Sequence, residues 1–111
     1  MRNIVKEACV ERLDEAILAE KNGANRIELC SRLDLDGLTP HRNMIKDVIN
    51  SVKIPVKVMI RPRAGNFVYH DQELDVMKDI LWKAWKLTPS KLNFMPYNVF
   101  VLDSSKKEYK Q

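Results

Sequence analysis

The sequence predicts an α/β fold made of three consecutive strand–helix units that share one parallel sheet. Three short segments of strand character, at residues 4–11, 26–30 and 55–60, are each followed by a segment whose apolar residues recur at helical spacing. Strands that alternate with helices of this length pair in parallel, because each helix carries the chain back along the sheet. The 111 residues suffice for one domain with a modest core.

The first unit extends to Gly23. Its side chains alternate between apolar and polar over residues 4–11, which is the period of a strand. A helix is predicted from Leu13, because acidic residues occupy its first turn, Lys21 lies in its last turn and apolar residues form a stripe. Gly23 is placed to end this helix in a left-handed conformation.

The second unit begins with a strand over residues 26–30, in which apolar and polar side chains again alternate. Thr39 followed by Pro40 predicts the start of the second helix, with threonine as the N-cap and proline at the first helical position. The apolar stripe of this helix runs to Val52.

The third unit begins at Pro55, which opens a strand rich in β-branched residues that runs to Ile60. Asp71 is predicted to cap the third helix. Thr88 and Pro89 are predicted to end it, because the residue before a proline avoids helical geometry.

The two faces of the predicted sheet differ in polarity, and this difference favours a barrel. One face is apolar and must lie under the helices; it carries Ala8, Val10, Ile27, Leu29, Val56, Val58 and Ile60. The other face carries mainly charged and sulfur-containing side chains, which are Glu7, Cys9, Glu11, Glu28, Cys30, Lys57, Met59 and Arg61. A doubly wound sheet would be apolar on both faces. Helices on one side only predict part of a (β/α)8 TIM-type barrel.

The net charge of +4 belongs to the C-terminal segment. Residues 1–82 contain equal numbers of basic and acidic side chains, so the excess lies in the lysine-rich remainder. We expect a barrel segment over residues 1–87 and a basic tail over residues 88–111, in which residues 98–102 could form a short strand beside the third one. A charge confined to a tail argues against nucleic acid as a partner.

The sequence also favours a cytoplasmic protein without a membrane partner. No apolar run reaches the roughly 18 residues that a membrane span needs, and charged residues interrupt the start of the chain, where a signal peptide would have its apolar core. Two cysteines are too few for a disulfide framework, so we expect free thiols.

Four motifs, in one order, resemble those of the CutC copper-homeostasis family. They are KEACVE at 6–11, GANRIELC at 23–30, GLTP at 37–40 and MIRPRAGNFVY at 59–69, the last followed by EL and VMKDI. The likeness covers roughly residues 4–81; the sequence beyond lacks the glycine-rich turn and fourth apolar strand with which a family member would continue. The resemblance implies a (β/α)8-type barrel, a cytosolic location and a role in copper handling. It further implies that Cu(I) is bound by cysteine thiols, with Cys9 and Cys30 as the ligands.

Cys9 and Cys30 share one sheet face with Met59, on three strands that should be neighbours. Parallel neighbours lie about 4.8 Å apart, so thiolates at matching height could share one ion. Two thiolates and a thioether are soft ligands of the kind that Cu(I) selects. In the alternative interpretation both cysteines are ordinary buried thiols and Met59 fills space, because free cysteine is often buried for packing alone.

The segment after the third strand holds a candidate anion site. Arg61 and Arg63, together with Asn66 and nearby backbone amides, could bind a carboxylate or phosphate through paired hydrogen bonds. In the alternative, Arg61 pairs with Glu28 on the neighbouring strand, because an inward charge needs a partner, and Arg63 lies in solvent.

The predicted function is copper homeostasis, with Cu(I) bound at Cys9 and Cys30 in an N-terminal part, or a truncated variant, of a CutC-like barrel. One alternative is a barrel enzyme that acts on a small anionic substrate at Glu28 and the arginine segment. Another is an inactive truncated product. Because three strands leave two sheet edges open, we expect the chain to self-associate through these edges.

Overall fold

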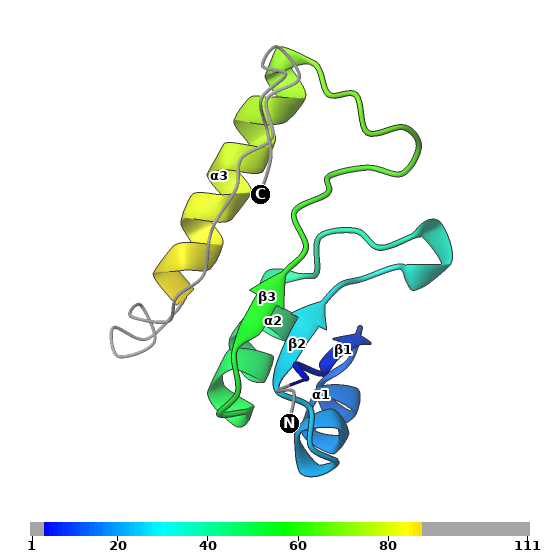
Figure 1. Ribbon diagram of the computed structural model, residues 1–111. Helices are drawn as coiled ribbons and strands as arrows, with labels where there is room; N and C mark the ends of the chain where they lie inside the picture. Colours follow the sequence, from blue (N-terminus) through cyan, green and yellow to red (C-terminus); the bar gives the residue numbers. More distant parts are fainter. Residues whose placement is uncertain (1–3, 88–111) are drawn as a thin grey trace.

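The computed structural model describes residues 4–87, which contain three strands, three α-helices and one short 3₁₀ helix (Figure 1). The elements follow in the order β1 (Glu7–Val10), α1 (Leu13–Lys21), β2 (Arg26–Leu29), η1 (Leu33–Leu35), α2 (Arg42–Ser51), β3 (Val56–Val58) and α3 (Asp71–Leu87). The strands form one parallel sheet in the order β1-β2-β3. The three predicted strand–helix units with parallel strands are therefore confirmed.

The strands are shorter than the alternation predicts, but backbone hydrogen bonds continue past their ends. The N–H of Cys30 donates to the carbonyl of Val10 at 2.9 Å, and the N–H of Met59 donates to the last carbonyl of β2 at 2.9 Å. In the sheet register, Cys9 of β1 lies opposite Glu28 of β2. The sheet therefore fixes the backbone at both cysteines.

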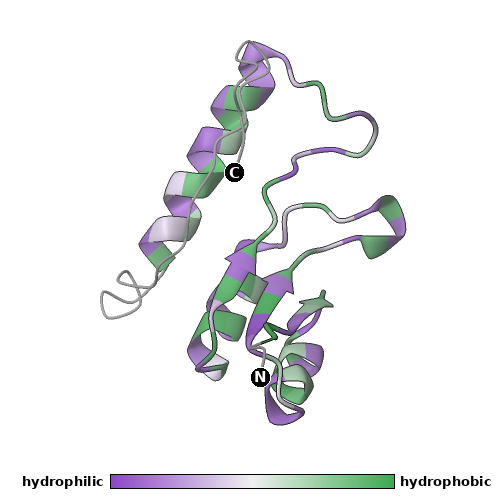
Figure 2. Cartoon of the chain, in the orientation of Figure 1, coloured by the Kyte–Doolittle hydropathy of each residue, from purple (hydrophilic) through white to green (hydrophobic). Residues whose placement is uncertain are grey.

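The apolar face of the sheet is buried under α1 and α2, as the strand patterns predict. Ile27 and Leu29 of β2 are fully buried and belong to one core with Ala16 of α1 and Val48 of α2. Figure 2 shows hydrophobic and hydrophilic residues alternating along the strands. Burial of each branched aliphatic side chain contributes about 1.5–3 kcal/mol, which holds the helices on this face. The opposite face is polar and is not covered by α1 or α2.

α2 begins later than predicted, and Thr39 is not its N-cap. The helix starts at Arg42, and the cap is His41, whose Nδ1 accepts a hydrogen bond from the N–H of Asn43 at 3.1 Å. Thr39 instead binds Arg61: its Oγ1 accepts from the Arg61 N–H at 2.8 Å, and its N–H donates to the Arg61 carbonyl at 3.0 Å. The prediction was wrong because a contact between two loops competes for the threonine hydroxyl.

Glu73, in the first turn of α3, binds the residue that precedes the helix. The carbonyl of His70 accepts from the N–H of Leu74 at 2.9 Å, which makes His70 the residue before the helix. Its own N–H donates to Oε1 of Glu73 at 3.0 Å, the reciprocal contact of a capping box. Asp71 is therefore the first helical residue and not the predicted cap.

α3 packs beside α2 and forms a small second core at its start. This core consists of Tyr69, Leu74 and Met77, with Ile60 packed against it. None of the helices within residues 4–87 is long and apolar enough to cross a membrane. The predicted helix end at residues 88–89 and the predicted strand over residues 98–102 lie outside the described residues.

Candidate metal site

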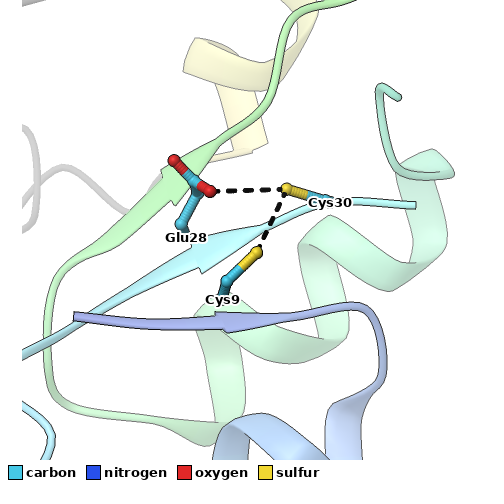
Figure 3. Close-up of side chains that lie close together, drawn as sticks. All are labelled: Cys9, Glu28 and Cys30. Carbon is cyan, nitrogen blue, oxygen red and sulfur yellow. Dashed lines mark hydrogen bonds between the residues drawn. The ribbon is translucent and has the colours of Figure 1, made fainter. Parts of the chain in front are cut away.

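Three side chains that can bind a metal ion meet on the polar face of the sheet (Figure 3). The Sγ atoms of Cys9 and Cys30 lie 3.9 Å apart, and Sγ of Cys30 lies 3.8 Å from Oε1 of Glu28. The two sulfur atoms and one carboxylate oxygen all lie within 4.8 Å of one another. The two cysteines lie on one face, as the strand patterns predict, and the register of the strands brings their sulfur atoms together, while metal binding itself stays a prediction.

The loop between β2 and α2 buries Cys30. An antiparallel bridge between Ser31 and Leu38 closes this loop. At Gly37 the backbone has a φ of +93°, which glycine adopts readily. A Cβ at Gly37 would lie 3.4 Å from Sγ of Cys30 and 3.5 Å from the methyl group of Met59. The loop therefore contacts Cys30 and Met59 together, and Cys30 is only 1% exposed.

Both thiols hold their protons more tightly than ordinary cysteines. The pKa of Cys30 is raised from 9.0 to about 12, first by burial and then by the neighbouring Cys9 and Glu28. Partial burial raises the pKa of Cys9 as well, and the carboxylate of Glu28 adds to this shift. The metal-free site is therefore a pair of neutral thiols at neutral pH. Because metal ions bind thiolates, an ion must displace these protons.

A second carboxylate on the same face, Glu7, is already bound by two cations. It forms ion pairs with Arg26 on β2 and with Lys57 on β3, the latter at 3.5 Å. Lys57 lies opposite Glu28 in the register of β2 and β3. Glu7 is thus engaged by Arg26 and Lys57, whereas the carboxylate oxygen of Glu28 lies close to the two thiols.

Arg61 is buried, at 5% exposure, and binds backbone carbonyls. One terminal nitrogen donates to the carbonyl of Leu35 at 2.7 Å and to that of Gly37 at 3.1 Å. The other donates to the carbonyl of Gly65 at 2.9 Å. The guanidinium also lies 4.7 Å from the ring centre of Phe67. Arg61 thereby ties the loop that covers Cys30 to the segment after β3.

The predicted ion pair between Arg61 and Glu28 is not formed. β3 ends at Val58, so strand alternation no longer directs the side chain of Arg61 toward the polar face. Two backbone hydrogen bonds to Thr39 fix Arg61 beside the loop instead. The pairing was predicted by extending the strand pattern three residues too far.

Arg63 also binds groups of the chain rather than lying in solvent. Its guanidinium donates two hydrogen bonds to the carboxylate of Glu73 and others to the carbonyls of Val68, at 2.6 Å, and Asn66, at 2.9 Å. The ion pair lowers the pKa of Glu73. The anion site proposed at Arg61, Arg63 and Asn66 stays a prediction, and most of its donors are already engaged within the chain.

The sequence gives signals for some of these contacts and not for others. Glu28 and Cys30 are two residues apart in a predicted strand, so alternation places them on the same face. The predicted ion pair with Arg61, however, left Glu28 out of the predicted metal site. No local pattern indicates that Gly37 contacts Cys30 or that Thr39 binds Arg61, because both contacts join loops that are distant in the sequence.

A parallel sheet with helices on one face and a polar, thiol-bearing opposite face defines strand–helix units of a TIM-type barrel. The model of the CutC family matches residues 4–93. The chain belongs to the CutC family. The match extends past residue 81, where the likeness was expected to end.

Related proteins share both sequence and fold. The copper homeostasis protein cutC homolog of Homo sapiens is 53% identical over 72 residues, which are 65% of this chain and 26% of that protein. A CutC family protein of Enterococcus faecalis is 44% identical over 87 residues, which are 76% of this chain and 42% of that protein. The crystal structure of a copper homeostasis protein CutC from Streptococcus agalactiae has a TM-score of 0.70 at 40% identity and covers 77% of this chain and 42% of that one. The chain spans less than half the length of these relatives.

Proposed function

We propose that this chain serves copper homeostasis by binding Cu(I) through the thiols of Cys9 and Cys30. The observation that carries the proposal is the 3.9 Å separation of two sulfur atoms, one on β1 and the other directly after β2. Soft sulfur ligands are those that select Cu(I). The human and streptococcal relatives, both named for copper homeostasis, support the same role.

The surroundings of the two thiols suit capture of an ion as cargo. Cys9 is exposed and offers a route of entry, whereas Cys30 is buried under its loop and offers a dry second ligand. Because the pKa values of both thiols are raised, uptake of the ion releases protons. Binding should therefore weaken as the pH falls.

An anaerobic Cu(I) titration in competition with a chromogenic Cu(I) chelator tests the proposal. The full chain should withdraw Cu(I) from the chelator at one site, and the Cys9→Ser, Cys30→Ser double variant should not. Circular dichroism of the double variant provides the control for folding. Equal competition by both proteins would contradict the proposal.

A further inference from the structure

The proposed Cu(I) site leaves one member of the cluster unused. Glu28 lies on β2, and one oxygen of its carboxylate lies 3.8 Å from Sγ of Cys30 and within 4.8 Å of Sγ of Cys9. Figure 3 shows the carboxylate of Glu28 and the thiol of Cys9 both reaching toward Cys30. Within residues 4–87 this carboxylate forms no ion pair, unlike Glu7 on the same face.

The distance between the two sulfur atoms distinguishes two coordination geometries. Two thiolates on one tetrahedral ion, with metal–sulfur bonds of about 2.3 Å, lie about 3.8 Å apart. A linear ion with bonds of the same length would hold them about 4.6 Å apart. The observed separation between Cys9 and Cys30 is 3.9 Å. In the metal-free chain the thiols therefore already lie near the tetrahedral spacing, so an ion with more than two ligands needs the smaller movement of the two sulfur atoms.

The carboxylate of Glu28 is placed to be the third ligand. A thiolate and a carboxylate oxygen on one tetrahedral zinc ion, at about 2.3 and 2.0 Å from the metal, lie about 3.5 Å apart. The corresponding distance from Cys30 to Glu28 is 3.8 Å, and the separation of Glu28 from Cys9 is within 4.8 Å.

Charge favours a divalent ion in this cluster. Two thiolates and one carboxylate carry three negative charges, so a monovalent ion leaves two of them uncompensated and a divalent ion leaves one. Uncompensated charge is costly beside a buried group such as Cys30. A mixed set of sulfur and oxygen ligands is also typical of Zn²⁺, which accepts both.

We propose that Cys9, Glu28 and Cys30 form a three-ligand site for a divalent cation of borderline softness, Zn²⁺. Its fourth position is open to solvent on the side of the exposed Cys9. Three protein ligands with an open position are the arrangement of zinc sites that bind water or a substrate group. The site shares its thiols with the proposed Cu(I) site, but only the divalent ion requires Glu28.

Co²⁺ serves as the spectroscopic probe for Zn²⁺ on the reduced, metal-free full chain. Binding should produce a thiolate-to-cobalt charge-transfer band and the intense visible bands of tetrahedral cobalt, and Zn²⁺ should abolish both. Glu28→Gln should lower the affinity for Co²⁺ by at least about tenfold. Glu7→Gln is the matched control, because it removes the same charge from the same face and should leave the affinity unchanged.

A parallel Cu(I) titration separates this proposal from the copper role. Glu28→Gln should keep its Cu(I) affinity, which also shows that the variant is folded and its thiols are intact. Absence of cobalt binding by the natural chain, or equal binding by Glu28→Gln, would overturn the three-ligand site. Loss of Cu(I) binding in Glu28→Gln would overturn it too, since Glu28 would then act on the thiols themselves. Cobalt binding without Cu(I) binding would support this site and contradict the copper role.

Discussion

Arg61 is a buried structural residue in this chain, although its position after a strand end predicts a ligand site. Its guanidinium binds carbonyls of two segments, the loop over Cys30 and the segment that contains Gly65. Within residues 4–87, its Nε is the one buried side-chain polar atom without a hydrogen-bond partner. Residue type and position suggest a ligand here, whereas the hydrogen bonds show that the charge holds two loops together.

Replacing Arg61 by lysine separates these two roles. An ammonium group lacks the planar fork that reaches three carbonyls at once, so Arg61→Lys should destabilise the chain by about 1.5–3 kcal/mol. Arg32→Lys is the control: Arg32 lies in the same loop and forms an exposed pair with Asp34, so its effect on stability should be small. Denaturant unfolding measures both. If Arg61→Lys has the same denaturation midpoint as the natural chain, the guanidinium does not hold the two loops together and is free for a ligand.

At the scale of elements, periodic patterns predict which segments form strands and helices, but not where they begin. Both predicted helix caps, Thr39 and Asp71, are displaced in the structure. In each case a histidine precedes the helix, His41 for α2 and His70 for α3. The cause for Thr39 lies outside the local sequence, because its hydroxyl is bound by Arg61. Elements follow from local pattern, whereas their ends depend on contacts between loops.

The candidate site follows the same rule. Alternation places Cys9, Glu28 and Cys30 on one face, so their common side could be predicted. Their heights along the sheet could not, because the register of β1 against β2 depends on the length and packing of the helix between them. The burial of Cys30 was equally unpredictable, since it depends on the approach of Gly37 in a loop without periodicity.

The ion pair between Arg63 and Glu73 makes the start of α3 sensitive to acid. The pKa of Glu73 is lowered from 4.5, first by the hydrogen bond from Arg63 and then by that from the backbone of His70. A lowered pKa means that the contact stabilises the fold above the unfolded value of 4.5 and that this contribution is lost as the pH falls toward the folded value.

Glu73→Gln should therefore lower the denaturation midpoint at neutral pH. The difference from the natural chain should shrink as the pH falls below 4.5, because the natural carboxyl then becomes protonated too. Asp79→Asn is the control: Asp79 pairs with Lys83 on the exposed side of α3 and should have little effect at any pH. Unfolding curves at several pH values measure both. A constant difference across this range would contradict the assigned role of the ion pair.

At the scale of the whole molecule, the sheet presents an open edge at β1. The carbonyls of Lys6 and Val10 accept hydrogen bonds from the side of β2. The backbone N–H and C=O groups of successive residues in a strand point to opposite sides. The N–H and C=O groups of Glu7 and Cys9 therefore point away from β2. No strand covers this edge within residues 4–87. The relatives, of which this chain spans less than half, supply further sequence with which a barrel could close it.

An open edge recruits strands of other molecules, so we expect the isolated chain to self-associate. Size-exclusion chromatography with light scattering should show an apparent mass that rises with protein concentration. Glu7→Pro should reduce the association, because proline removes an N–H that points outward and is tolerated in an edge strand. Ala8→Pro is the control that should unfold the sheet, since its N–H points toward β2. A monomer at all concentrations with a single cooperative unfolding transition would show that the chain is stable with this edge open.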